Sequence, residues 1–335
     1  MRTSARARPA GAPSRFDDAD LSAAAALLED ASSVVILAHV NPDADALGSA
    51  LALGLALSRN GCTVQVAFAE PAEIPESLAG LAGAELVVPA DDVDPTPGLL
   101  VTVDVNSRAR LGRLGALVDT TPRTLVVDHH ASNTRFGSDH VVDVTAESTT
   151  VLIAALLDRM GLPIDTDIAE NLYAGLATDT VGFRHSTGAG HRLAGRLLDV
   201  GVSPDELMRP ITDTHPEGWL GMLAAVLGRA EVVTASTGTR VVWTWITTED
   251  AAGLRSEELD SVIDIVRTTK GTQVAAVFKQ AGPAHWQVSL RSLPGTDVSA
   301  VATVLGGGGH VRAAGYSCDG TIGQARERLL AALSG

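Results

Sequence analysis

The sequence is poor in cysteine, in aromatic residues and in long apolar runs. Its 335 residues include two cysteines, Cys62 and Cys318, and only 3% aromatic residues. Two cysteines so far apart exclude a cysteine zinc cluster and a disulfide framework, and we expect both thiols to be reduced in a cytoplasmic protein. The longest strongly apolar stretch, residues 47–57, is shorter than the ~20 residues that cross a bilayer. No membrane span is therefore expected.

Positive charge is also scarce. The chain has 25 Lys and Arg against 40 Asp and Glu, which gives a net charge of −15. This excess of negative charge argues against binding long nucleic acid through a broad basic surface, and the few aromatics leave no extended platform for stacking bases. Short anionic substrates are not excluded, because metal ions or a few arginines can reverse the charge locally.

The length suits two domains. We expect residues 1–19, whose charged side chains are mostly basic, to be a disordered tail. Residues 20–200 alternate short apolar runs with helical periodicity, which predicts an α/β domain with a doubly wound, mainly parallel sheet. Residues 201–229 are rich in Pro and Gly and suit a helical connector. Residues 230–335 predict a second, smaller α/β domain.

Polar side chains follow three predicted strands at the point where each strand ends. His39 follows the strand predicted over residues 34–37, and Asp104 follows the one over residues 99–103. Asp128-His129-His130 follows another apolar run. In an open α/β sheet, ligands bind at the carboxyl ends of the strands. These side chains are therefore candidate ligands at one edge of the sheet.

Three further carboxylates lie near predicted helix ends. Asp43 and Asp45 precede a predicted helix over residues 46–58, where they suit either an N-cap pair or metal ligands. Asp179 closes an apolar helix, where the helix dipole disfavours a carboxylate. Together with the strand-end residues they form an oxygen and nitrogen ligand set without sulfur. Such a set suits Mn²⁺, Mg²⁺ or Co²⁺ and is large enough for two ions, which indicates phosphate-ester or phosphoanhydride hydrolysis.

In this order, the polar segments resemble the motifs of the DHH phosphoesterase family. The motifs are His39-x-x-x-Asp43-x-Asp45, Asp104, Asp128-His129-His130 and Asp179. Gly306 to His310 resembles the signature of the family's smaller associated domain, and the resemblance covers nearly the whole chain after about residue 20. It implies two divalent cations, Mn²⁺ above all, bridged by Asp104. The first would be held by His39, Asp43 and Asp104, and the second by Asp45, Asp104, His129 and Asp179.

The resemblance also implies roles for residues that are not metal ligands. His130 is expected to hydrogen-bond the phosphate oxygens or to assist the leaving group, and Asp128 to orient an imidazole. The smaller domain is expected to grip the nucleotide, with the active site in the cleft between the domains. The substrate-binding candidates there are Arg291, Gly307, Gly308, Gly309 and His310.

Length and charge fit the compact members of the family, which resemble nanoRNases that also act on 3′-phosphoadenosine 5′-phosphate, cyclic di-AMP or its linear product pApA. The expected substrates are therefore small nucleotides and short oligonucleotides, hydrolysed to nucleoside monophosphates. Inorganic pyrophosphate or polyphosphate is an alternative substrate, and a non-catalytic nucleotide sensor is an alternative function. The sequence leaves open which nucleotide is preferred and whether the chain forms a homodimer.

Overall fold

The computed structural model describes residues 18–334. They form two compact units that divide between Thr214 and His215, a point within the predicted connector 201–229. Most of the expected N-terminal tail lies outside the described residues, but Asp18 and Ala19 already belong to helix α1, so the predicted tail is two residues too long. The reason is that α1 packs against α4, where Asp18 pairs with Arg159. No helix within the described residues is long and apolar enough to cross a membrane.

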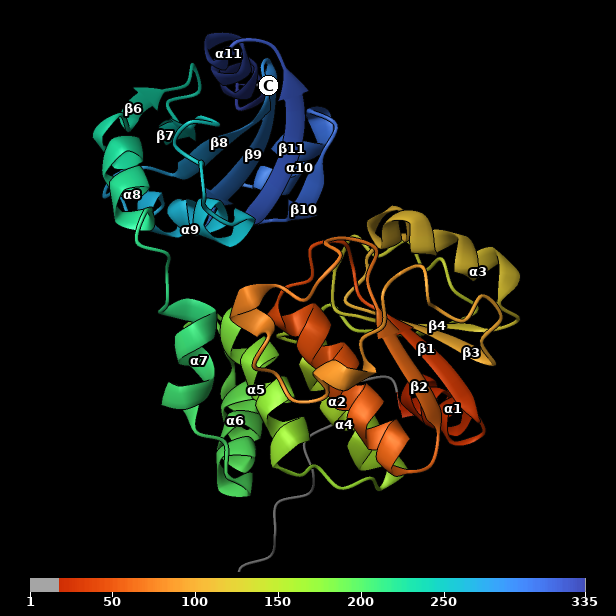
Figure 1. Cartoon of the computed structure of the whole chain (residues 1–335). Coiled ribbons are helices and arrows are strands. Elements are labelled where there is room, and N and C mark those ends of the chain that lie inside the picture. Colours follow the sequence, from red (N-terminus) through yellow and green to blue (C-terminus); the bar gives the residue numbers. More distant parts are fainter. Residues whose placement is uncertain (1–17, 335) are drawn as a thin grey trace, which may run out of the picture. The chain divides into compact units, whose positions relative to one another are not determined.

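The first unit is built on a five-stranded sheet with the order β2-β1-β3-β4-β5 (Figure 1). All four strand pairings are parallel, which confirms the predicted parallel α/β sheet. The strands are β1 (Ser33–Leu37), β2 (Thr63–Ala67), β3 (Leu99–Val103), β4 (Thr124–Asp128) and β5 (Asp139–Val142).

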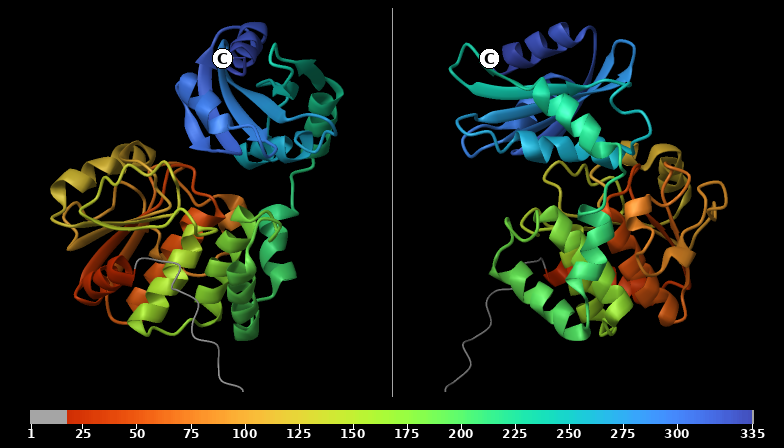
Figure 2. Two further views of the ribbon diagram at one scale, coloured as in Figure 1. Left: turned by 180° about the vertical axis from the view of Figure 1, so that it is seen from behind. Right: turned by 60° about the vertical axis from the view of Figure 1, so that its left-hand side comes forward.

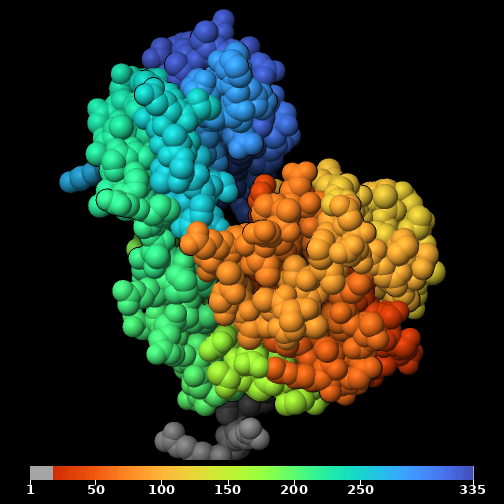
Figure 3. All heavy atoms as spheres, viewed as in Figure 1, coloured from red at the N-terminus to blue at the C-terminus, as the bar shows by residue number. Residues whose placement is uncertain are grey.

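Helices cover both faces of this sheet, because neighbouring residues of each strand point to opposite faces. Ile36 lies in the larger core, with the apolar sides of α2, α4 and α5. Leu37 lies in a smaller core with residues of the 3₁₀ segment η3, which α3 follows. Figure 2 shows the helices of the larger core stacked on one side of the strands, and in the space-filling view the segment between β2 and β3 covers much of the face of this unit that is in view (Figure 3). The helical elements are α1 (Asp18–Glu29), α2 (Ala44–Arg59), η1 (Glu76–Leu78), η2 (Ala84–Leu86), η3 (Arg108–Ala116), α3 (Leu117–Thr120), α4 (Thr149–Met160), α5 (Thr166–Asp179), α6 (Gly188–Val200) and α7 (Pro204–Thr212).

The strand order places a topological switch point between β1 and β3. The chain passes from β1 to β2 on one side and then returns to β3 on the other side of β1. In such sheets, ligands bind in the crevice outside the carboxyl ends of the two strands at the switch point. His39 and Asp104 follow those two strands, so the fold itself brings them together.

The second unit has a six-stranded mixed sheet with the order β10-β11-β9-β8-β7-β6. Only β7 and β8 pair in parallel, and the other pairings are antiparallel. Gly308–His310, part of the glycine-rich signature, forms the edge strand β10 against β11. The elements are α8 (Trp219–Gly228), β6 (Glu231–Thr234), β7 (Arg240–Ile246), α9 (Ser256–Val266), β8 (Val274–Gly282), β9 (His285–Ser292), α10 (Val298–Val304), β10 (Gly308–His310), β11 (Ala313–Asp319) and α11 (Ile322–Ala332).

Candidate metal centre

Asp104 lies at the centre of the site. It follows β3 in a left-handed backbone conformation, with φ of 60°, which Asp adopts more readily than most residues. Only 4% of its surface is exposed. Its Oδ2 lies 3.6 Å from Nε2 of His39, and its Oδ1 lies 3.6 Å from Nε2 of His129. The two oxygens therefore face two different groups of ligands, which is the arrangement that a bridging carboxylate needs.

His39, Asp43 and Asp104 form the first group, with ligand atoms within 4.8 Å of one another. Nε2 of His39 is 3.7 Å from Oδ2 of Asp43, which is beyond ordinary hydrogen-bond length. On the other side of the ring, Nδ1 lies 2.9 Å from the carbonyl oxygen of Val40. A proton on Nδ1 would donate to that carbonyl and leave the lone pair of Nε2 for a metal ion.

The geometry of Asp43 suits both alternatives that the sequence left open, N-cap and metal ligand. Asp43 is the N-cap of α2, where its Oδ1 accepts hydrogen bonds from the backbone N–H groups of Asp45 and Ala46 at 3.1 and 3.0 Å. Its Oδ2 faces His39. The cap therefore fixes the carboxylate and leaves one oxygen for coordination.

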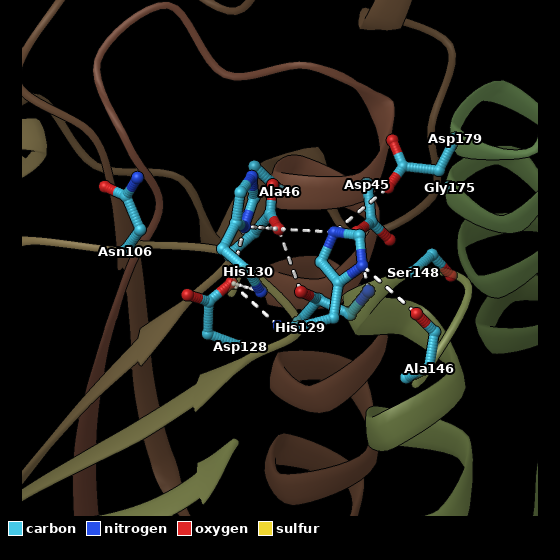
Figure 4. A network of polar contacts seen from close by, with 12 residues as sticks. Asp45, Ala46, Asn106, Asp128, His129, His130, Ala146, Ser148, Gly175 and Asp179 are labelled. Atoms are coloured by element: carbon cyan, nitrogen blue, oxygen red, sulfur yellow. Dashed lines mark hydrogen bonds and ion pairs between the residues drawn. The ribbon is translucent and has the colours of Figure 1, made fainter. Parts of the chain in front are cut away.

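Asp45, Asp104 and His129 form the second group. Nε2 of His129 lies 3.9 Å from Oδ2 of Asp45 and 3.1 Å from Oδ2 of Asp179, the last residue of α5. Its Nδ1 lies 3.3 Å from the carbonyl oxygen of Ala146, so this ring is also oriented with Nε2 toward the carboxylates (Figure 4).

The buried carboxylate of Asp45 is held by the first turn of α4. The backbone N–H groups of Thr149 and Thr150 donate to its two oxygens at 2.6 and 2.9 Å, and the partial positive charge of a helix N-terminus favours such contacts. The hydroxyl of Thr149 also donates to Oδ1 of Asp104 at 2.9 Å. Sequence reasoning missed Thr149. The available signal was a Ser-Thr-Thr sequence at a helix start, but its partners lie 104 and 45 residues away.

His130 is fixed by Asp128 beside the two ligand groups. Nδ1 of His130 lies 2.7 Å from Oδ1 of Asp128, which also accepts the backbone N–H of His129 at 2.8 Å. Oδ2 of Asp128 accepts a hydrogen bond from the side-chain amide of Asn133 at 2.6 Å. Burial lowers the pKa of His130, but the hydrogen bond to Asp128 and the charge of Asp104 outweigh it and raise this pKa above its usual value. A protonated imidazole suits interaction with a phosphate.

Comparison with known protein families decides the identity. The model described as "DHH family, N-terminal domain" matches residues 33–176, and the model described as "DHHA1 domain" matches residues 238–335. The bifunctional oligoribonuclease and PAP phosphatase NrnA of Thermus thermophilus is 32% identical to this chain, over 90% of the chain and 89% of the relative. The chain belongs to the DHH family. It is a metal-dependent phosphoesterase.

Other relatives are similar over most of the chain, and a solved structure shares its fold. The probable NrnA of Streptococcus mutans is 27% identical over 84% of this chain and 88% of its own. The cyclic-di-AMP phosphodiesterase GdpP of Geobacillus thermodenitrificans is 25% identical over 92% of this chain, which spans about half (48%) of that relative. An exopolyphosphatase-related protein of Bacteroides fragilis shares the fold, with a TM-score of 0.86 and 24% identity over 95% of this chain and 96% of that chain.

The side chains of this DHH-family centre concentrate negative charge in a buried place. Burial and the charges of neighbouring carboxylates raise the pKa of Asp45 well above its usual value. Burial is also the main reason that the pKa of Asp179 rises to about 6, although His129 opposes the rise. A divalent cation offsets the repulsion between such buried carboxylates and stabilises their charged form. The donor set therefore fits the divalent ions expected from the sequence.

We predict that the imidazoles of His39 and His129 release protons when metal binds. Burial lowers the pKa of His39, but Asp104 and Asp43 raise it to about 10. Burial likewise lowers the pKa of His129, and Asp179 with other carboxylates raises it to about 10. Both rings are therefore protonated at pH 7 without metal, whereas a ligand imidazole must be neutral. We expect the two imidazoles to release about two protons as Mn²⁺ binds, and the affinity for Mn²⁺ to increase with pH up to about 10.

Titration calorimetry in buffers with different ionisation enthalpies measures this release. His39→Asn should reduce it by about one proton. His285→Asn, which changes a partly exposed histidine paired with Asp319, should leave it unchanged. Equal heats in all buffers would show that the imidazoles are already neutral before metal binds.

In the second unit, the glycine run of residues 306–309 mainly allows the backbone of β10 to lie close to β11. A Cβ on Gly307 would lie 2.1 Å from the carbonyl oxygen of Gly315, and one on Gly309, at φ of 138°, would lie 2.6 Å from that of Ala313. Gly308 has nothing within 4 Å of its Cβ position. Close pairing of β10 with β11 thus explains two of the three glycine candidates, and Gly308 faces open space. His310 ends β10.

Two aromatic side chains outside the metal centre, those of Trp286 and Phe183, pack within hydrophobic clusters. Trp286 is 5% exposed in the core of the second unit, and its Nε1–H donates to the carbonyl of Gly320 at 2.9 Å, so it offers no base-stacking surface. Phe183 packs against Tyr173 and His191.

Proposed function

We propose that this phosphoesterase hydrolyses short oligonucleotides and small nucleotides to nucleoside monophosphates, using two divalent cations. The substrate class comprises nanoRNA, linear pApA or cyclic di-AMP, and 3′-phosphoadenosine 5′-phosphate. The observation that carries the two-ion proposal is the carboxylate of Asp104, whose oxygens face His39 and His129 separately. The Thermus thermophilus relative, named an oligoribonuclease and PAP phosphatase, supports the choice of substrates. Such nucleotides occur in the cytoplasm, where we expect the protein to act.

We assign the metal ligands in two sets that share Asp104. His39 and Asp43 complete the first set, and Asp45, His129 and Asp179 complete the second. Mn²⁺ is the expected ion, with Mg²⁺ or Co²⁺ as alternatives. Bound there, the ions would supply an activated water and neutralise charge on the phosphate.

Side chains of the protein would position the substrate and neutralise negative charge on its phosphate during the reaction. Asp128 accepts a hydrogen bond from Nδ1 of His130 and thereby fixes the ring, so that Nε2 can donate to a phosphate oxygen or to the leaving oxygen. Asn133 in turn holds Asp128. In the second unit, Arg291, Gly308 and His310 would contribute to binding the nucleotide.

Product release by the purified protein tests the proposal. We expect Mn²⁺-dependent release of nucleoside monophosphate or phosphate from pApA, cyclic di-AMP and 3′-phosphoadenosine 5′-phosphate. Chelator should abolish this release, and a long single strand should be a poor substrate. Turnover of pyrophosphate alone would instead assign the enzyme to phosphoanhydride hydrolysis. Tight nucleotide binding without turnover of any compound would contradict the proposed hydrolysis.

A further inference from the structure

The helix that carries Asp179 ends in a strained turn. Asp179 is the last residue of α5, and its carboxylate is directed toward the imidazole of His129 (Figure 4), with Oδ2 3.1 Å from Nε2. Beyond the helix, Val181, Gly182 and Phe183 all have left-handed backbone conformations, with φ of 54°, 64° and 65°. Three such residues in succession, two of them not glycine, are uncommon. A candidate metal ligand therefore lies directly before a strained segment of backbone.

The strain is concentrated at Val181. Its backbone N–H donates to the carbonyl of Thr178 at 3.0 Å, and that of Gly182 donates to the carbonyl of Ala177 at 2.8 Å. These two bonds form the Schellman motif that ends many helices, in which glycine usually occupies the position held here by Val181. A left-handed conformation is especially unfavourable for a β-branched residue. The side chain of Val181 is 39% exposed, so its burial does little to offset this cost.

Thr180 ties the strained turn to the helix. Only 1% of its surface is exposed. Its hydroxyl donates to the carbonyl of Leu176 at 2.6 Å and accepts the backbone N–H of Phe183 at 3.0 Å. Its own carbonyl accepts the backbone N–H of His185 at 3.0 Å. The hydroxyl therefore joins the last turn of α5 to the third left-handed residue, across Val181.

We propose that Thr180 is a positioning residue of the metal centre, whose hydroxyl stabilises the strained turn and thereby holds the carboxylate of Asp179 in place for one of the two cations. A helix can end in a Schellman motif with glycine and needs no strain to do so. Strained backbone persists only where the surrounding structure stabilises it, and it is concentrated at functional sites. The peptide bond between Asp179 and Thr180 leads into this turn, so relaxation of the turn would reorient Asp179.

Binding of Mn²⁺ in the absence of substrate tests this inference, which rests on the two-ion centre of the proposed function. Thr180→Val keeps the branching of the side chain but removes the hydroxyl, and it should weaken the binding of one Mn²⁺ ion per chain by about 10–100-fold. Thr180→Ser retains a hydroxyl and should remain within about threefold of the wild type. Thr212→Val is the matched control, because the hydroxyl of Thr212 also donates to a carbonyl four residues earlier, that of Met208 at 3.0 Å, at the exposed end of α7. It should bind both ions as the wild type does.

Val181→Gly tests whether the hydroxyl acts through the strained turn. Glycine adopts a left-handed conformation without strain, so the turn would no longer depend on Thr180. Val181→Gly alone should not lower the midpoint of denaturant unfolding and should keep the wild-type affinity for Mn²⁺. Combined with Thr180→Val, it should restore most of the lost affinity. Failure of the combined variant to regain Mn²⁺ affinity would contradict the role of the turn.

The readout separates positioning from general stability and from the proposed hydrolysis. A lower unfolding midpoint together with wild-type Mn²⁺ affinity in Thr180→Val would show a purely structural role and overturn the inference. If Thr180→Val does not fold, Thr180→Ala, which leaves room for a water molecule beside the N–H of Phe183, should show the same loss of affinity, and wild-type affinity in Thr180→Ala would likewise overturn it. Because no substrate is present, loss of Mn²⁺ affinity supports the inference even if no nucleotide is hydrolysed.

Discussion

Asp104→Asn should lower kcat/KM on every phosphoester substrate by on the order of 10³-fold, which corresponds to ~4 kcal/mol of lost transition-state stabilisation. Asparagine keeps the shape of the side chain but offers one neutral oxygen in place of two charged ones. The oxygens of Asp104 face His39 on one side and His129 on the other, so the substitution affects both groups of ligands at once. Steady-state kinetics with saturating Mn²⁺ measure the effect.

Asp158→Asn is the matched control. Asp158 lies on α4 and pairs with Arg196 at the surface, so its replacement removes one carboxylate from the same unit without touching the site. We expect wild-type activity and a change in stability below ~1 kcal/mol. A loss of less than about tenfold in Asp104→Asn would mean that Asp104 does not hold the metal ions.

Gly175→Ala should impair both stability and activity, because α5 approaches α2 and α4 closely at this position. A Cβ on Gly175 would lie 2.7 Å from Oδ1 of Asp45 and 2.6 Å from Cγ2 of Thr150. Both contacts are too short, so the helices must separate or the buried carboxylate must move. We expect the free energy of unfolding to fall by ~1–3 kcal/mol. Displacement of Asp45 should lower kcat by about 100-fold.

Gly195→Ala controls for the change of residue type. Gly195 lies within α6, and nothing lies within 4 Å of its Cβ position. This substitution should leave kcat unchanged and stabilise the protein by ~0.5–1 kcal/mol, because alanine favours helix more than glycine does. Denaturant unfolding and steady-state kinetics test both variants. Wild-type stability and kcat in Gly175→Ala would show that the close helix packing does not position Asp45.

Elements with strong local patterns could be predicted from the sequence. The apolar run predicted as a strand over residues 99–103 agrees with β3 at both ends. The parallel sheet is confirmed, and it explains why residues after β1, β3 and β4 converge although they are far apart in the sequence. By contrast, β5 and α6 were missed. The strand β5 is short and only partly buried, and few residues of α6 are buried, so neither has a strong apolar signal.

The contacts that support the site were harder to predict than its acidic and histidine residues. Thr149 donates hydrogen bonds to Asp45 and Asp104, and Asn133 donates one to Asp128. Such pairings depend on tertiary packing. The glycine run illustrates a second difficulty. Four glycines in a row predict a flexible backbone. The structure shows instead that Gly307 and Gly309 lie so close to β11 that a side chain would not fit. Composition alone does not distinguish these two reasons for glycine.

The number of Mn²⁺ ions bound per chain tests the central claim most directly. Mass spectrometry of the metal content, after equilibration with Mn²⁺ and removal of free ion, should find about two ions per wild-type chain and at most about one in Asp104→Asn. Asp158→Asn should retain the wild-type content. A single ion in the wild type, or two ions retained in Asp104→Asn, would contradict a centre of two cations bridged by Asp104.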